Sequence, residues 1–327
     1  MSSAESMPED RALSPEDWST EPEQRYAQTQ AALAEHHGLE IESLVTDTSA
    51  GPVHYLEAGN PEGEPVLLLH GVSTTGATWL PLASTLADEH RLIMPDRPGM
   101  GLSAKPSYRG RKLRSFMVSY LLDLLDTLEI ERPHVVGNSL GGKQAFLLTL
   151  DHGRVDRLCL VGGPGGVTRK FPILARLLTM RGINRLLFWL TYRGDPVETA
   201  RELMDRTNVV DDSAISEAFY EVLAANAELP GRNESLRSLN NQQGSFGRMH
   251  PLFDLREEIT GIERPTCFVW GSEDSFFAPE YGRSLAERMP DAEFHELPNH
   301  GHTPWMEPSE ETETRVRTFL SDGGNKE

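Results

Sequence analysis

The chain has 327 residues, 38% hydrophobic and 25% charged, which is enough for one large α/β domain with an insertion or for two small domains. Its 31 Lys and Arg are outnumbered by 50 Asp and Glu, so the formal net charge is −19. A surface of this sign repels phosphate backbones, and we expect no nucleic-acid partner. The acidic, lysine-poor composition fits either a high-salt protein or an ordinary acidic cytosolic one, and the sequence does not separate the two.

The first 24 residues are acidic and contain three prolines, a composition that predicts a disordered tail over residues 1–24. This segment has no apolar stretch of the kind that secretory signals carry, so we expect a cytoplasmic protein. A helix is predicted next, over residues 23–37, and Gly38 ends it.

Short apolar segments that predict buried strands then alternate with periodic segments that predict helices. The strands are expected within 41–48, 53–59, 65–71, 90–99, 134–139, 157–163, 265–274 and 292–299, and helices at 78–89 and 115–130. This alternation predicts an α/β fold with a mostly parallel, doubly wound sheet.

The alternation stops between 167 and 250, where the pattern is nearly all helical, and it returns with a strand at Thr266. A helical block in this place predicts a cap with an apolar underside, inserted over a core formed by residues 25–166 and 251–322. The glycine-rich segment 162–166 lacks the Gly-Lys-Ser/Thr of a phosphate loop, and we interpret it as the flexible exit from strand to cap.

Several features argue against other classes of protein. The longest apolar stretch, 171–190, is interrupted by three arginines, which argues against a membrane span. Cys159 and Cys267 each lie in a predicted buried strand, so we interpret them as structural thiols without a disulfide. The pairs at 36–37 and 211–212 lack the spacing of metal ligands, and we expect neither a metal nor a cofactor.

Ser139 lies in the segment VVGNSLGG, between Gly137 and Gly141, where a predicted strand meets a predicted helix. A sharp strand-to-helix turn strains its corner residue and requires small neighbours. The alternative is a tight turn with an incidental serine. Since a serine hydroxyl is a weak nucleophile, a catalytic role requires a base, a group that orients the base, and donors for the oxyanion.

Two later segments also follow predicted strands: GSEDSFFAP contains Asp274, and NHGHTPW contains His300 and His302. Because the carboxyl ends of parallel strands meet at one edge of a sheet, these side chains can approach Ser139. The order Ser, Asp, His along the chain matches one known triad arrangement and neither protease order. Glu273 stands beside Asp274 and competes for the role of the acid.

Together these motifs resemble the capped branch of the α/β-hydrolase superfamily, from about residue 50 to residue 320. LLLHG resembles the oxyanion-loop strand, DRPGMGLS the D-x-x-G-x-G-x-S loop, GNSLGG the nucleophile elbow, and GSEDSFFAP and GHTPWMEP the acid and base segments. The family's G-H-x-P and G-x-x-D spacings imply a triad of Ser139, His302 and Asp274.

The resemblance also implies the surroundings of the triad. Backbone N–H groups of Val72 and Leu140 are expected to form the oxyanion hole, the latter at the start of a helix whose dipole favours negative charge. His70, Asn138 and Trp305 are the candidate residues of the substrate pocket, and in this family the position of His70 usually shapes the oxyanion loop.

A serine nucleophile implies acyl transfer, so our main interpretation is hydrolysis of an ester-like bond in a small, largely apolar substrate. Asn138 directly before the nucleophile resembles the subgroup that cleaves carbon–carbon bonds in ring-fission dienones. That subgroup tends to carry Trp directly after the base, where this chain has Thr303. A third interpretation is a ligand-binding member of the fold without turnover, which a p-nitrophenyl ester screen with a Ser139→Ala control distinguishes. The sequence leaves the oligomeric state open.

Overall fold

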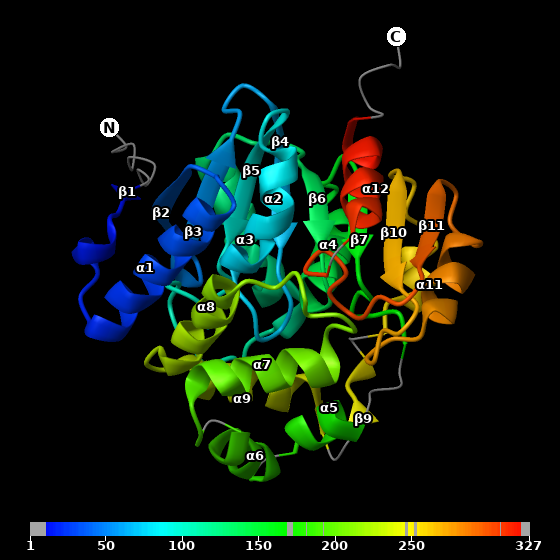
Figure 1. The fold of residues 1–327 in the computed structure, drawn as a ribbon. Helices are drawn as coiled ribbons and strands as arrows, with labels where there is room; N and C mark the ends of the chain where they lie inside the picture. Colours follow the sequence, from blue (N-terminus) through cyan, green and yellow to red (C-terminus); the bar gives the residue numbers. More distant parts are fainter. Residues whose placement is uncertain are drawn as a thin grey trace, which may run out of the picture.

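The structure is a computed structural model that describes residues 11–168, 173–180, 182–191, 193–245, 248–251, 254–307 and 309–321. Within these residues nine strands form one sheet (Figure 1). They are β1 (Arg11–Ala12), β2 (Ile41–Thr48), β3 (Gly51–Gly59), β4 (Glu64–Leu69), β5 (His90–Pro95), β6 (His134–Gly137), β7 (Leu158–Val161), β10 (Thr266–Gly271) and β11 (Ala292–Leu297).

The strand order across the sheet is β1-β2-β3-β5-β4-β6-β7-β10-β11. From β5 to β11 all neighbours pair in parallel, whereas β1 with β2, β2 with β3, and β3 with β5 pair antiparallel. The mostly parallel α/β fold that the sequence predicts is therefore confirmed.

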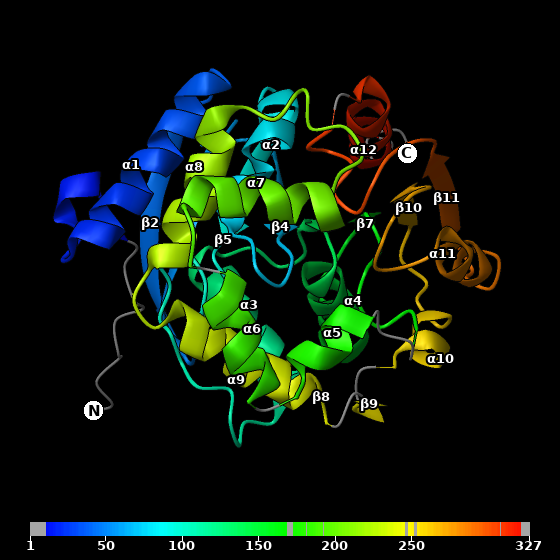
Figure 2. The same ribbon diagram turned by 60° about the horizontal axis from the view of Figure 1, so that its bottom comes forward.

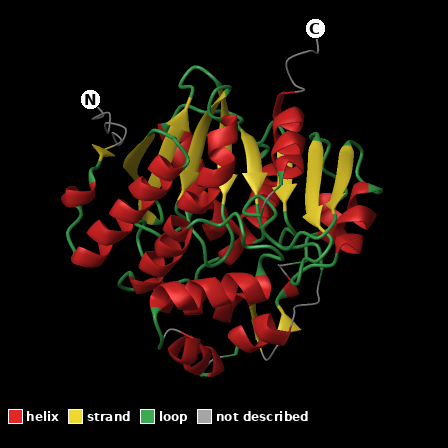
Figure 3. Cartoon of the chain, viewed as in Figure 1, coloured by secondary structure: helices red, strands yellow, loops and turns green. Residues whose placement is uncertain are grey.

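Helices cover both faces of the sheet, which is why its central strands are continuously apolar. Val66 and Leu68 of β4 point into one core, and Leu67 and Leu69 point into the other. The first core is closed by α1 (Glu21–His36), α2 (Leu80–Leu86) and α12 (Glu310–Ser321), and the second by α3 (Leu113–Thr127), α4 (Leu140–His152), α10 (Arg256–Ile259) and α11 (Pro279–Ala286) (Figures 1 and 3).

The N-terminal segment differs from its prediction. Residues 1–10 lie outside the described part of the chain, but β1 pairs with β2, and η1 (Pro15–Asp17) precedes α1. The prolines at 15 and 22 occupy the first or second positions of these helices, where proline has no hydrogen bond to lose and favours the start. They therefore begin ordered elements over 11–24.

The region between β7 and β10 contains α5 (Ile173–Leu178), α6 (Ile183–Thr191), α7 (Pro196–Thr207), α8 (Glu217–Glu228) and α9 (Arg232–Gln243). A short antiparallel pair follows, β8 (Gly244–Ser245) with β9 (Arg248–Met249). Helices α5, α6, α7 and α9 gather below the sheet in Figure 1 and come forward in Figure 2, whereas α8 contacts α1. No helix among the described residues has the length and apolar character that a bilayer crossing requires.

Candidate active site

The order of the strands places a crevice beside β6. The chain passes from β4 to β5 on one side of β4, and it later returns to β6 on the other side. In open parallel sheets such a reversal leaves a crevice at the carboxyl ends of the two strands. The loop after β4 begins at His70, and the turn after β6 carries Ser139.

Ser139 occupies a strained corner. It precedes the first residue of α4 with φ 52° and ψ −114°, a backbone region that side-chain-bearing residues rarely adopt. The flanking glycines are required by close packing, because a Cβ on Gly141 would lie 2.0 Å from the carbonyl oxygen of Leu69 and one on Gly137 would lie 2.8 Å from Gly142 Cα. The turn therefore holds the Ser139 side chain at the end of the strand.

His302 and Asp274 form a buried pair. His302 Nδ1 donates to Asp274 Oδ2 at 2.8 Å, which leaves Nε2 as the free ring nitrogen of this pair. Asp274 Oδ1 accepts from the backbone N–H groups of Phe276 at 2.8 Å and Phe277 at 2.9 Å. Burial alone raises the pKa of Asp274, but the charge and hydrogen bond of His302 and these backbone donors outweigh burial, so its pKa lies below the usual value.

Ser139 and His302 line the same cavity, of about 280 Å³, together with Asn138 and the oxyanion candidates Val72 and Leu140. Phe276 packs against the His302 ring with 4.7 Å between the ring centroids. Most of the remaining wall is apolar and includes cap residues, namely Leu178, Leu187, Phe188, Leu203 and Leu236. The geometry thus brings the candidate nucleophile, the candidate base and a largely apolar cavity together at one end of the sheet.

Comparison with known proteins identifies the family. A family model described as "Alpha/beta hydrolase family" matches residues 66–315. The chain belongs to this family. The membership confirms the resemblance that the sequence motifs show, and the protein is accordingly a hydrolase of the α/β-hydrolase fold.

Curated relatives of the hydrolase cover most of its length. It is 30% identical over 274 residues to a 2-hydroxy-6-oxononadienedioate/2-hydroxy-6-oxononatrienedioate hydrolase of Paraburkholderia phymatum, covering 82% of this chain and 90% of the relative. It is 28% identical over 276 residues to a 2-hydroxy-6-oxo-6-phenylhexa-2,4-dienoate hydrolase of Burkholderia cepacia, covering 83% and 92%.

Among solved structures, the carboxylesterase CesB of Bacillus subtilis has a TM-score of 0.74 at 20% identity and covers 93% of this chain and 100% of its own. A variant of the meta-cleavage product hydrolase of Pseudomonas fluorescens has a TM-score of 0.68 at 24% identity. The match covers 85% of this chain and 97% of that structure. At these identities the likenesses show the fold.

Asn138 and Gly163 hold the candidate base and the candidate acid through hydrogen bonds. The side-chain amide of Asn138 donates to the backbone carbonyls of Val161 at 2.8 Å and His302 at 3.1 Å. The N–H of Gly163 donates to Asp274 Oδ2 at 2.9 Å, and a Cβ at this glycine would lie 2.7 Å from the same oxygen. The glycine-rich segment that the sequence suggests as a flexible exit therefore holds the Asp274 carboxylate through its backbone, a contact that needs no side chain and leaves no motif.

Arg97 fixes the loop that carries the candidate oxyanion donor. Its guanidinium donates to the carbonyl oxygen of Val72 at 2.6 Å and to the hydroxyl of Tyr108 at 3.0 Å. Its backbone N–H donates to His70 Nε2 at 2.9 Å. Sequence reasoning missed this residue, although it lies in the DRPGMGLS segment that marks the family.

Asp96, which begins that segment, is the centre of a second buried pair outside the cavity. Its Oδ2 lies 2.7 Å from His54 Nδ1, and its Oδ1 accepts from the N–H of Gly76 at 2.9 Å. Burial raises the pKa of Asp96, but the charge and hydrogen bond of His54 outweigh burial and hold the pKa below its usual value. The motif carboxylate thus joins its own loop to His54 of strand β3 and to Gly76 of the loop after β4, and no hydrogen bond described for it reaches Ser139, His302 or Asp274.

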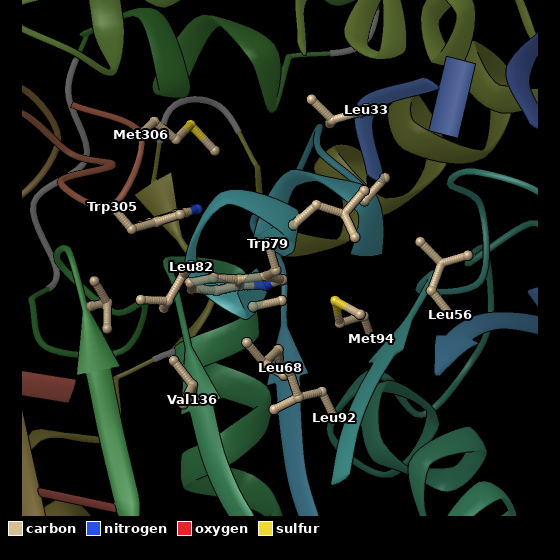
Figure 4. Close-up of a cluster of buried hydrophobic side chains, with 14 of the residues drawn as sticks. Leu33, Leu56, Leu68, Trp79, Leu82, Leu92, Met94, Val136, Trp305 and Met306 are labelled. Atoms are coloured by element: carbon tan, nitrogen blue, oxygen red, sulfur yellow. The ribbon is translucent and has the colours of Figure 1, made fainter. Parts of the chain in front are cut away.

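His70 and Trp305, two candidate pocket residues, differ from expectation because both lie outside the cavity lining that the described residues form. His70 Nδ1 donates to the carbonyl of Gly71 at 2.8 Å, and its other nitrogen accepts from the backbone N–H of Arg97, so the imidazole holds the loop after β4. Trp305 stacks on Trp79 with 4.1 Å between ring centroids (Figure 4). Its indole N–H donates to the backbone carbonyl of Thr78 at 2.9 Å. Both are occupied by structural contacts. Asn138, in contrast, does reach the cavity wall.

One group of potential metal ligands exists in the part of the chain that the structure describes. Ligand atoms of Cys267, Glu293 and His295, on the neighbouring strands β10 and β11, lie within 4.8 Å of one another. Cys159 lies opposite Cys267 across the β7–β10 pair, and both thiols are free and buried. The expected absence of a metal remains a prediction.

Proposed function

We propose that the protein is a serine hydrolase that cleaves a carbon–carbon bond next to a ketone in a ring-fission dienone, with Ser139 as nucleophile, His302 as base and Asp274 as its orienting acid. The observation that carries the proposal is the Asp274–His302 hydrogen bond of 2.8 Å, at the edge of a cavity that Ser139 also lines. The curated relatives named as dienoate and dienedioate hydrolases favour this bond among those a serine can attack.

In the proposed reaction, His302 accepts the proton of Ser139 Oγ while the hydroxyl oxygen attacks the ketone carbon. Backbone N–H groups of Val72 and Leu140 would stabilise the oxyanion that forms, and one such donor typically lowers the activation free energy by ~3 kcal/mol. Collapse of the intermediate breaks the carbon–carbon bond. For this step the 2-hydroxyl proton of the substrate must first move to the carbon next to the ketone. The electron pair of the broken bond is then delocalised into the conjugated 2-oxo fragment, which takes a proton from His302, and water hydrolyses the acyl–Ser139 ester to release a carboxylic acid.

Asp274 has a defined part in this scheme. By accepting from Nδ1, it keeps that nitrogen protonated and leaves Nε2 to exchange protons with Ser139. Its low pKa keeps the carboxylate ionised, which favours the imidazolium that forms during attack.

The proposal is tested by following the loss of the dienone chromophore of 2-hydroxy-6-oxo-6-phenylhexa-2,4-dienoate with purified protein and with Ser139→Ala. We expect turnover by the natural chain, none by the variant, and a kcat/KM well above that for p-nitrophenyl butyrate. Ester hydrolysis without dienone cleavage would contradict the carbon–carbon assignment.

One observation favours ester hydrolysis as a second candidate. Thr303, directly after the base, lines the cavity where the carbon–carbon hydrolases tend to carry Trp, and its hydroxyl donates to the carbonyl of Asn208 at 3.2 Å. The smaller side chain leaves more room beside His302, which suits an ester with a bulky acyl group. Both reactions would use the same triad, so variants of the triad cannot distinguish them. Comparing turnover of the phenyl dienone with turnover of p-nitrophenyl butyrate does distinguish them.

A further inference from the structure

Lys143 lies one helical turn after Ser139 on α4. The backbone N–H of Lys143 donates to the carbonyl oxygen of Ser139 at 3.1 Å, so Lys143 lies in the turn that leads from Ser139 into α4. Lys143 lines the same cavity as Ser139 and His302. A Cβ at Gly165 would lie 3.3 Å from both Lys143 Cβ and the carbonyl oxygen of Ser139, so this glycine packs over both residues.

The position is unusual for a lysine. The residue is only 2% exposed, and the cavity wall around it is largely apolar. Burial, and after it the positive charge of Arg114, hold the pKa of the Lys143 ammonium well below its usual value. An anion in the cavity would oppose both effects, because an opposite charge nearby favours the protonated form.

From this placement, and resting on the proposed function, we propose that Lys143 forms an anion subsite that binds a carboxylate on the acyl part of the substrate. The acyl carbon is bonded to Ser139 in the intermediate, so its position is known. Because Ser139 and Lys143 line one cavity of about 280 Å³, the arrangement suits a short aliphatic acyl group that ends in a carboxylate. The hydrolase would then prefer diacid-derived acyl groups to monoacids of equal length.

The first test compares p-nitrophenyl hydrogen adipate with p-nitrophenyl hexanoate, which have acyl chains of equal length and differ in the terminal carboxylate. We expect the natural chain to favour the adipate half-ester in kcat/KM. In Lys143→Met this preference should fall roughly 10- to 100-fold, mainly through KM, because a buried hydrogen bond to a charged group is lost. An unchanged preference in Lys143→Met would overturn the subsite.

Lys112→Met is the matched control, since Lys112 is exposed at the start of α3, outside the cavity lining. It should leave the preference within about twofold. A fall as large as that of Lys143→Met would mean that general surface charge attracts the adipate half-ester, and would count against a local subsite.

A second measurement does not depend on turnover or on the choice of reaction. Monomethyl adipate and dimethyl adipate are titrated calorimetrically into Ser139→Ala and into Ser139→Ala/Lys143→Met. We expect the charged ester to bind more tightly to the first protein and to lose that advantage in the second. If this difference appears while the natural chain cleaves neither dienone nor ester, the subsite stands and the proposed function fails. If both proteins bind the two esters alike while hydrolysis proceeds, the subsite fails and the function stands.

Discussion

The side-chain amide of Asn138 donates a hydrogen bond of 3.1 Å to the backbone carbonyl of His302, so the residue before the candidate nucleophile holds the chain at the candidate base. The same amide nitrogen donates at 2.8 Å to Val161, at the end of the neighbouring strand β7. Asn138 therefore ties together three chain segments whose relative position decides whether Ser139 and His302 can exchange a proton.

Asn138→Ala should lower kcat by about 10²-fold with little change in KM, because a displacement of the base by about 1 Å has an effect of this size. The measurement is steady-state kinetics on whichever substrate the natural chain turns over. Asn60→Ala, which alters an asparagine in a turn far from the cavity, is the control and should retain full activity. A loss confined to KM would indicate that Asn138 binds substrate and does not position His302.

Ser139→Ala and His302→Ala should each abolish nearly all hydrolysis, and the double variant should be hardly slower than either single one. Residues that act in one step give strongly non-additive losses. Single-turnover rates of the three variants provide the measurement. Losses that multiply would show that the two residues do not share a step.

His70 should make stability depend on pH. Burial is the main cause that lowers its pKa to about 4 in the folded protein, from 6.5 for the ordinary side chain. Between these values the unfolded chain binds more protons than the folded one, so the stabilisation is fully present above pH 6.5 and is lost as pH falls toward 4. This one group should lower the free energy of unfolding by about 2 kcal/mol between pH 8 and pH 5.

Urea unfolding of the natural chain and of His70→Gln at pH 8 and pH 5 measures this contribution of His70 to the free energy of unfolding. The glutamine carbonyl can still accept from the N–H of Arg97 but does not titrate, so the variant should lose less stability on acidification. His36→Gln, at an exposed position, should behave like the natural chain. Equal acid sensitivity of all three proteins would contradict the buried neutral imidazole.

Trp305 should matter for stability and not for substrate choice. Because it is 6% exposed and stacked on Trp79, Trp305→Ala should lower the free energy of unfolding by about 3–5 kcal/mol. Trp189→Ala removes a side chain that is 59% exposed and should cost less than about 0.5 kcal/mol. Relative kcat/KM for two substrates of different size should be the same in Trp305→Ala as in the natural chain, and a changed ratio would place Trp305 at the cavity after all.

The apolar wall of the cavity predicts a dependence on acyl length. From p-nitrophenyl acetate to hexanoate, kcat/KM should rise. Each methylene that becomes buried should stabilise the bound transition state by at most ~0.8 kcal/mol. Leu187→Phe places a larger side chain in the cavity lining and should shift the acyl length with the highest kcat/KM to shorter esters. Activity that is greatest on acetate in the natural chain would indicate that the cap closes the cavity to alkyl groups.

The sequence alone was sufficient for the sheet, the strained turn at Ser139 and the three triad candidates. These depend on local constraints: continuous apolar strands, glycines that permit a sharp turn, and polar residues at strand ends that parallel topology brings to one edge. It was not sufficient for residues 11–24, where composition suggested disorder but the prolines occupy helix starts.

Tertiary structure decided the parts that depend on contacts between distant segments. Trp305 and His70 have suitable chemistry for a pocket, yet stacking and backbone hydrogen bonds place them in the scaffold. The backbone N–H of Gly163 holds the candidate acid Asp274, a contact that no side-chain pattern records. Lys143 follows Ser139 by four residues in the sequence, but only the tertiary structure shows that its side chain is buried at the cavity, because burial is a property of the whole fold and not of sequence spacing.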